Sequence, residues 1–255
     1  RAAKVMEKRI DMIEKVELPA ERDPLEIPIR VEKESGTLDL ELKEVVAGYQ
    51  DGFASKRFSL EIRFSKRVGF MGLNGSGKST LLKTIAGEIV PLEGQVLLGS
   101  GLRIGNMMQE HESLPRDSSP LHFLMERGRL PISQAYSKLA KFGFDPERVK
   151  TPTSALSPGG RARLLLACFS ALSVNMLVLD EPTNHLDIEA LEALEELLAS
   201  YQGTVILVSH DRYFLEKARL DDIYVLEAGT LTRVPDYSSY LATATARAER
   251  LLKMW

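Results

Sequence analysis

The sequence predicts an α/β fold built on a parallel sheet that is covered on both faces. Three short apolar runs lack the polar–apolar alternation of half-exposed strands: RVGFMG, NMLVLD and GTVILVSH. Strands buried on both sides of a parallel sheet have this composition. Stretches with helical spacing of apolar residues separate the runs, such as the leucines of 191–198. Alternating strands and helices indicate a parallel sheet.

The composition limits the classes of protein that fit. With 255 residues, of which 44% are hydrophobic, the chain is long enough for one large domain with appendages. No apolar run approaches 18 residues, so the sequence predicts no membrane span. The single cysteine, Cys168, excludes an internal disulfide framework and Cys-cluster zinc sites, and we interpret it as an inert core residue. A net charge of −3 gives no general attraction to nucleic acid.

The sequence of the N-terminal part predicts a helix, then a connector and then two strands. Residues 4–17 have helical spacing of apolar residues among charges, and three prolines make residues 18–28 an extended connector. Residues 38–42 and 58–64 alternate between apolar and polar, which is typical of antiparallel strands with one wet face.

The remaining pattern completes the expected domain layout. Helical patterns with proline breaks suggest an inserted helical subdomain at about 112–173, and the tail is expected to be a final helix. We therefore divide the chain into residues 1–36, a main domain at 37–235, and residues 236–255.

GLNGSGKST at 72–80 is a phosphate-binding loop in its required context, between a strand-like run and a helix-like run. Its glycines let the backbone curl and turn N–H groups toward phosphate oxygens, and the following helix adds its positive end. An incidental glycine-rich turn would not need this context. Lys78 is expected to reach the β- and γ-phosphates, Ser79 the Mg²⁺ ion and Thr80 another phosphate oxygen. The expected nucleotide contacts are Gly72, Asn74, Gly75, Ser76, Gly77, Lys78, Ser79 and Thr80.

Two carboxylates and a histidine follow the later apolar runs. Asp180 ends one run and is expected to hold Mg²⁺, and Glu181 is placed to polarise a water molecule. The alternative, an acidic pair capping a helix, does not explain the preceding strand or the phosphate loop. His210 follows the next run and is expected to sense the γ-phosphate with a ring hydrogen bond.

Further candidates lie between and around these motifs. Gln109 is expected to contact metal and water at the junction with the helical subdomain. Tyr49 is predicted to stack an adenine ring, with Phe53 as the competing aromatic residue. Ser157 and the N–H of Gly159, in LSPGGR, form a second anion-binding helix start, although such a turn is also a common helix cap.

Together these motifs resemble those of the ATP-binding cassette (ABC) superfamily over residues 38–235, in the same order. The resemblance implies an ABC-type ATPase with a P-loop parallel-sheet core, an antiparallel β subdomain and an inserted α-helical subdomain. It also implies ATP and Mg²⁺ as ligands, a nucleotide contact at Asp187, and head-to-tail pairing of two cassettes. In that pairing Ser157 and Gly159 complete the site of the partner cassette, which lies in the same parent chain or in a second copy of this one.

DEPTNHLD and SHDRYFL are similar to the ABC-F class, whose cytoplasmic proteins carry two cassettes joined by a helical linker and often act on the ribosome. Residues 1–17 resemble the end of that linker, so the chain is interpreted as a second cassette. The resemblance implies contact with the ribosome and the P-site tRNA through the linker, in translation or antibiotic resistance, and no direct membrane contact.

Alternatives stay open at this point. The ATPase subunit of a membrane transporter shares every nucleotide motif, and a nucleotide-gated scaffold with little turnover is a third class. A DNA-repair cassette fits less well, because zinc modules or coiled-coil insertions are absent from the sequence. Pro158 and Gly160 depart from the usual family signature, and Pro158 removes one backbone N–H. We expect weaker γ-phosphate recognition in the partner site, without its loss.

Overall fold

The computed structural model describes residues 38–107, 114–184 and 186–242. Three predictions fall outside these ranges in whole or in part. They concern residues 1–36, Gln109 and most of the expected final helix. Residues 237–242 are helical. Within the described ranges, no helix has the length and hydropathy that crossing a membrane requires.

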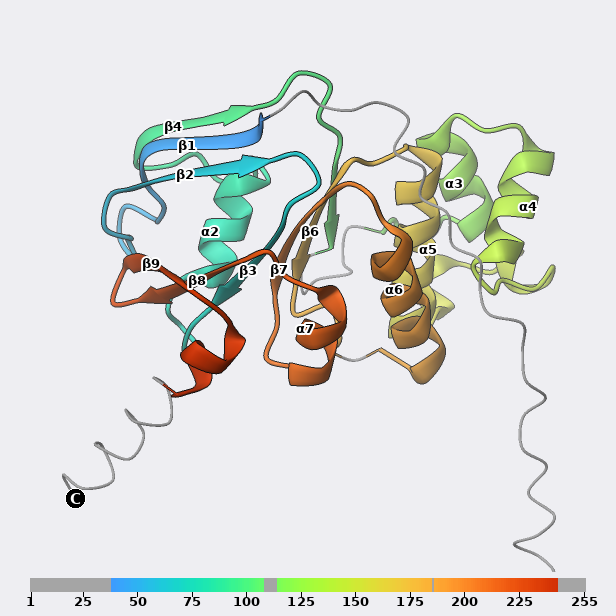
Figure 1. Ribbon diagram of the computed structural model, residues 1–255. Helices are drawn as coiled ribbons and strands as arrows, with labels where there is room; N and C mark the ends of the chain where they lie inside the picture. The colour runs from blue at the N-terminus through green and yellow to red at the C-terminus, as the bar shows by residue number, and fades with distance from the viewer. Residues whose placement is uncertain (1–37, 108–113, 185, 243–255) are drawn as a thin grey trace, which may run out of the picture.

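A six-stranded sheet forms the centre of the molecule (Figure 1). Its order is β5-β6-β7-β3-β8-β9, and all neighbouring pairs are parallel except β8 with β9. The strands are β3 (Arg67–Met71), β5 (Ile104–Met107), β6 (Met176–Asp180), β7 (Thr204–Val208), β8 (Asp222–Glu227) and β9 (Thr230–Val234).

The absence of alternation in β6 and β7 has the predicted cause. Met176 and Val178 face one hydrophobic core, and Leu177 and Leu179 face another on the opposite side of the sheet. All four side chains are fully buried. Successive strand residues point to opposite faces, so a strand covered on both sides needs apolar residues throughout.

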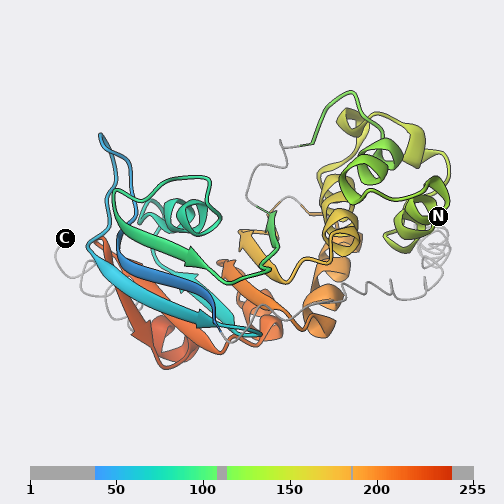
Figure 2. The same ribbon diagram turned by 90° about the horizontal axis from the view of Figure 1, so that it is seen from above.

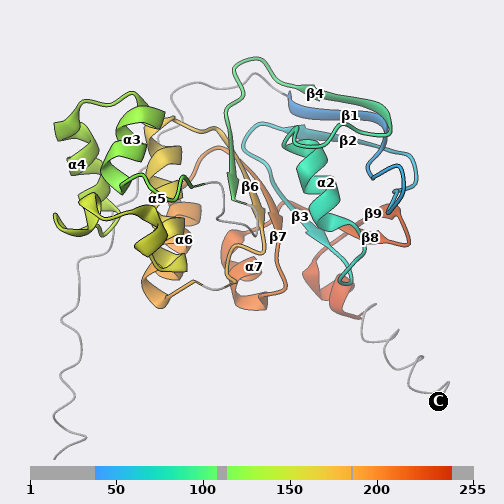
Figure 3. The same cartoon turned by 180° about the vertical axis from the view of Figure 1, so that it is seen from behind.

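The antiparallel subdomain covers one of these faces. It consists of β1 (Leu38–Val46), β2 (Phe58–Arg63) and β4 (Glu93–Leu98), in the order β2-β1-β4. Helix α2 (Lys78–Ile85) lies between this sheet and the central sheet, as Figures 1 and 3 show, and its Leu81, Leu82 and Ile85 share one core with both sheets. This core fixes the helix that follows the phosphate loop.

The helical subdomain lies at the far end of the molecule from the antiparallel sheet (Figure 2). It contains α3 (Pro120–Gly128), α4 (Ile132–Lys141) and α5 (Pro158–Ala171), with short 3₁₀ turns at Arg148–Lys150 and Thr153–Ala155. Helices α6 (Ile188–Ser200) and α7 (Arg212–Ala218) complete the layer against the central sheet. Cys168 is buried in α5, and burial raises the pKa of its thiol to about 12, in agreement with an inert core residue.

Candidate nucleotide-binding site

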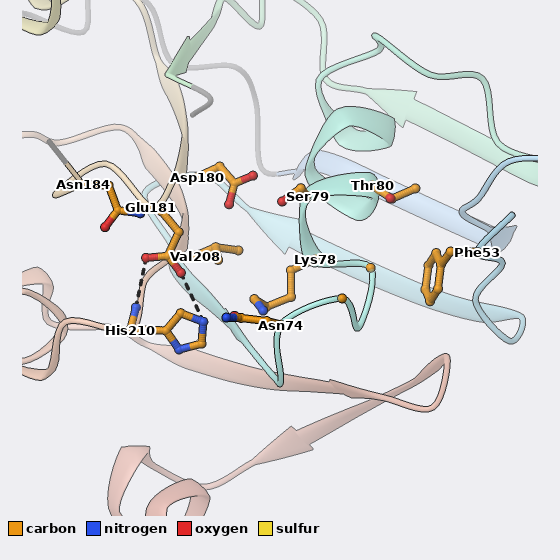
Figure 4. A pocket seen from close by; sticks show the side chains of 12 residues that line it. Phe53, Asn74, Lys78, Ser79, Thr80, Asp180, Glu181, Asn184, Val208 and His210 are labelled. Carbon is orange, nitrogen blue, oxygen red and sulfur yellow. Dashed lines mark hydrogen bonds and ion pairs between the residues drawn. The ribbon is translucent and has the colours of Figure 1, made fainter. Parts of the chain in front are cut away.

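A cavity of about 460 Å³ lies where the phosphate loop meets the ends of β6 and β7 (Figure 4). The carboxyl ends of neighbouring parallel strands meet at one sheet edge, and ligands of open α/β sheets bind there. The cavity is lined by Phe53, Asn74, Gly75, Gly77, Lys78, Ser79, Thr80, Asp180, Glu181, Asn184, Val208 and His210. The fold thus brings the phosphate loop together with the carboxylate pair and His210, both of which lie about a hundred residues or more further along the chain.

The N-terminus of α2 supplies an anion-binding surface. Helix α2 begins at Lys78, its N-cap Gly77 makes no side-chain hydrogen bond, and the first turn contains no acidic residue. The first N–H groups of a helix have no intrahelical partners, and the helix dipole favours negative charge beside them. No side chain of the cap competes with a phosphate for these groups.

The ammonium group of Lys78 is held by the phosphate loop itself. Its Nζ donates hydrogen bonds to the carbonyl oxygens of Gly72 at 2.9 Å and Leu73 at 3.0 Å. Burial lowers the pKa of Lys78, against the opposing attraction of Glu181 and Asp180. A buried ammonium group that donates only to neutral carbonyl oxygens forms stronger hydrogen bonds when charged phosphate oxygens replace them.

Asp180 and Ser79 fit a magnesium ion. Asp180 is 2% exposed, and its Oδ1 has no hydrogen-bond partner among the described residues. Burial raises the pKa of Asp180, against the hydrogen bond from Ser79 and the charges of Lys78 and Lys83. An unpaired buried carboxylate oxygen is costly unless a ligand satisfies it. Mg²⁺ commonly binds through one or two protein groups plus phosphate and water, and Asp180 and Ser79 supply two such groups.

Glu181 and His210 form a connected pair at the edge of the cavity (Figure 4). The backbone N–H of His210 donates to Glu181 Oε2 at 3.2 Å, and His210 Nε2 lies 3.3 Å from Glu181 Oε1. Glu181 has a φ of 47°, and its N–H donates to the carbonyl oxygen of Val208 at 2.8 Å. Left-handed backbone is uncommon for glutamate and concentrates at functional sites. The His210 N–H thus orients the carboxylate, and the bond to Val208 fixes the backbone that carries it, while Oε1 has no hydrogen-bond partner among the described residues.

The aromatic candidates differ in position. Tyr49 is 47% exposed and does not line the cavity, whereas Phe53 does, with its ring against Gly77. A bridge between Gly48 and Ala54 and a hydrogen bond from Tyr49 N–H to the Phe53 carbonyl close the turn that carries both residues.

Ser157, Gly159 and Asp187 lie together, outside the cavity. Ser157 caps α5 by accepting a hydrogen bond from Gly160 N–H at 3.1 Å, and its hydroxyl lies 3.4 Å from Asp187 Oδ2. Asp187 also caps α6, accepting from Ala190 N–H at 2.9 Å. Asp187 therefore contacts both helix caps, and the start of α5, predicted to bind an anion, lies apart from the cavity that holds Lys78.

Asn184 also lines the cavity, although no sequence motif predicts a role for it. Its N–H donates to the Glu181 carbonyl at 3.1 Å. Its position in the short polar stretch that follows the carboxylate pair is the sequence feature that could have predicted this role.

The site and fold define a P-loop nucleotide-binding protein, and comparisons with known proteins place it more narrowly. The ABC transporter family matches residues 55–184, and the description "AAA domain, putative AbiEii toxin, Type IV TA system" matches 160–216. "Probable ATP-binding protein YheS" of Escherichia coli K12 is 37% identical over 229 residues, covering 88% of this chain and 36% of that protein. "ABC transporter F family member 5" of Arabidopsis thaliana is 34% identical over 246 residues, covering 94% and 35%.

The chain belongs to the ABC family of ATP-binding cassettes, and within it to the F class. Cassettes of this family are ATPases and function with a second cassette. The chain spans about a third of the length of these curated relatives. CbiO1 of Clostridium perfringens, part of the ABC transporter complex CbiONQ, has a similar fold, with a TM-score of 0.63 at 22% identity over 84% of this chain and 95% of that one.

Proposed function

We propose that this chain is the second ATPase cassette of a cytoplasmic ABC-F protein that closes on ATP and acts on the ribosome. The observation that carries the proposal is the convergence of Lys78, Asp180, Glu181 and His210 on one cavity. The match to F-class relatives supports the ribosomal role, and a position in a two-cassette chain fits the share of those relatives that it covers.

The first step of the mechanism is the capture of the triphosphate. The helix start at Gly77 and the loop amides take the phosphates, and Lys78 moves from the loop carbonyls to the β- and γ-phosphate oxygens. Mg²⁺, held by Ser79 and Asp180, would neutralise charge on these phosphates.

Hydrolysis then depends on the pair at the cavity edge. Glu181 orients and polarises the attacking water, and His210 keeps the carboxylate in place through its backbone N–H while its ring donates to the γ-phosphate. Nearby Asn184 fixes the turn that carries Glu181 through its carbonyl oxygen. Because Ser157 and Gly159 lie elsewhere, their helix start acts on the nucleotide of a second cassette.

The test uses the full-length parent protein with Glu181→Gln. Loss of a general base costs about 10²–10⁴-fold in rate, so this variant is expected to bind ATP, hydrolyse it poorly and sediment with ribosomes only when ATP is present. The control adds Lys78→Ala to Glu181→Gln, which removes the phosphate contact and should abolish ATP-dependent sedimentation. Unchanged turnover would refute the role of Glu181. Association with a membrane subunit and not with ribosomes would replace the proposal by the transporter alternative.

A further inference from the structure

The charge of the chain is unevenly distributed. The stretch from the start of α3 to the end of α5, residues 120–171, contains eight basic and three acidic residues, a net charge of +5. The rest of the chain contains 25 basic and 33 acidic residues, a net charge of −8. The overall value of −3 therefore conceals a basic subdomain, and a basic region on one part of a protein is the electrostatic footprint of a polyanionic partner.

The basic charge that is open to a partner lies on α4. Helices α4 and α5 together contain four basic residues and no acidic residue. Arg163 of α5 is buried and lies over the ring of Phe144, whereas Lys138 of α4 is half-buried and Lys141 is exposed. Figures 1 and 3 show α4 at the outer edge of the helical subdomain. A large partner can therefore approach these two lysines.

A cavity of about 280 Å³ lies where α4 meets α5. The ring of Phe142 lines it together with side chains that all donate hydrogen bonds. These polar side chains are Ser133, Gln134, Ser137, Lys138, Lys141 and Ser170. No carboxylate lines the cavity among the described residues, and it shares no lining residue with the nucleotide cavity. A lining made only of donors and cations suits an anion with several acceptor oxygens.

The cavity is built on fixed side chains. Ser170 is 8% exposed and Phe142 is 1% exposed, so the floor belongs to the packed interior. Lys138 Nζ donates to the Ser170 hydroxyl oxygen at 2.9 Å. Gln134, Lys138 and Lys141 follow one another at spacings of four and three residues, which places them on one face of α4. A lysine that is already held loses less side-chain freedom when a ligand binds.

The size of the cavity indicates which anion it takes. Pockets for whole small-molecule ligands measure about 300–1,000 Å³, so this cavity fits one phosphate group of a longer chain better than a complete nucleotide. Contacts from lysine, serine and glutamine to phosphate oxygens position proteins on nucleic acid without reading its sequence. A net charge of +5 over one subdomain also suits a polymer that carries a phosphate on every residue.

We infer that the face of α4 that carries Ser133, Ser137, Lys138 and Lys141 binds a backbone phosphate of ribosomal RNA. This inference rests on the proposed function, because the ribosome supplies the RNA. The contact would add affinity and orientation to the cassette without taking part in ATP hydrolysis.

The test measures ATP-dependent ribosome binding of the full-length parent with Glu181→Gln in a series of salt concentrations. One variant adds Lys138→Gln and Lys141→Gln, and the control variant adds Lys43→Gln and Lys56→Gln, which remove the same charge from exposed lysines of the antiparallel subdomain. Each lost lysine–phosphate contact lowers the slope of log K against log salt by about 1. The α4 pair should therefore lower the slope by about 2 and weaken binding about 5- to 30-fold at about 0.15 M salt, and the control pair should change neither.

Two further readouts separate a lost contact from a disturbed fold. Lys141→Gln alone leaves the hydrogen bond between Lys138 and Ser170 in place and should lower the slope by about 1. With Glu181 restored, the α4 variants should keep their ATPase rate without ribosomes within about twofold, because neither lysine lines the nucleotide cavity.

A second measurement needs neither ribosomes nor ATP. Binding of a labelled RNA duplex to the nucleotide-free parent should show the same difference in slope between the α4 pair and the control pair. Equal slopes and affinities for the two pairs would overturn the inference. Displacement of the duplex by millimolar inorganic phosphate at constant ionic strength would reveal a free-phosphate site and overturn the assignment to RNA.

The two measurements also distinguish the partner and the proposed function. Weaker ribosome binding of the α4 pair with unchanged duplex binding would assign this face to an acidic protein surface and overturn the RNA contact. A parent that does not sediment with ribosomes would refute the proposed function, and the duplex would still report on α4.

Discussion

Replacing Gly77 by alanine tests how the entrance of the nucleotide cavity is built. Gly77 has a φ of 98°, and a Cβ atom there would lie 2.1 Å from two ring carbons of Phe53. Gly75 is the matched control, because its φ is 77° but nothing lies within 4 Å of its Cβ position. Both substitutions introduce backbone strain, and only the one at Gly77 also displaces a ring.

The two costs can be separated in magnitude. Left-handed backbone costs an L-residue about 1–2 kcal/mol, which applies to both alanine variants. Full burial of a phenylalanine contributes about 1.5–3 kcal/mol, so displacing the half-buried Phe53 adds about 1 kcal/mol at Gly77 alone. For a protein of this size, 1 kcal/mol corresponds to a Tm difference of about 2–4 °C.

The assay is thermal unfolding of the nucleotide-free protein for Gly77→Ala, Gly75→Ala and each of them combined with Phe53→Ala. Gly77→Ala should melt about 2–4 °C below Gly75→Ala. With Phe53 replaced by alanine, that excess should disappear, since the methyl group no longer meets a ring. The reasoning is refuted if alanine at Gly77 costs no more than at Gly75, or if the excess survives the loss of Phe53.

Two further substitutions probe the metal ligand and the second helix start. Burial raises the pKa of Asp180, so the carboxyl stabilises the fold below its unfolded pKa of about 3.9 and loses this contribution as the pH rises through its folded pKa. Asp180→Asn should therefore stabilise the nucleotide-free protein by about 0.5–2 kcal/mol at pH 7, less in melts toward pH 4, and abolish Mg²⁺-dependent ATP binding. Gly159→Ala would place a methyl group 2.2 Å from Asp187 Oδ2, breaking a helix cap at a cost of about 1 kcal/mol in denaturant unfolding. Gly160→Ala, with its nearest neighbour at 3.4 Å, should be neutral in the same assay.

The parts of the fold that could be predicted from sequence were those in which burial leaves a pattern. The apolar runs of β3, β6 and β7 and the alternation in β1 and β2 each report how many faces of a strand are covered. Strand β4 gave no such signal, because it is an edge strand whose Leu97 and Leu98 are both exposed. Its position is set by pairing with β1, which is a tertiary contact.

In the candidate site, too, the sequence predicts some features and tertiary contacts set the others. The phosphate loop and the carboxylate pair could be placed because a strand must precede each of them and a helix must follow the loop. The sequence could not predict which of Tyr49 and Phe53 lines the cavity. Both lie in one seven-residue turn, and the bridge from Gly48 to Ala54 that closes this turn determines which ring points inward. The hydrogen bond from Lys78 Nζ to Gly72 is accepted by a backbone carbonyl, so the side chain at position 72 does not predict it.

In the proposed function, the position of Ser157 and Gly159 outside the nucleotide cavity is the reason why one cassette needs a second. Lys78, Asp180 and Glu181 face one cavity, while Ser157 presents its helix start beside Asp187, outside that cavity. If the start of α5 binds nucleotide as proposed, the ligand must touch two cassettes, and its γ-phosphate would contact the second cassette only in the closed state. Such a ligand has a differential affinity for closure, which is the physical requirement for driving it. In this proposal, hydrolysis at Glu181 removes the γ-phosphate and with it the difference in affinity, so the pair reopens.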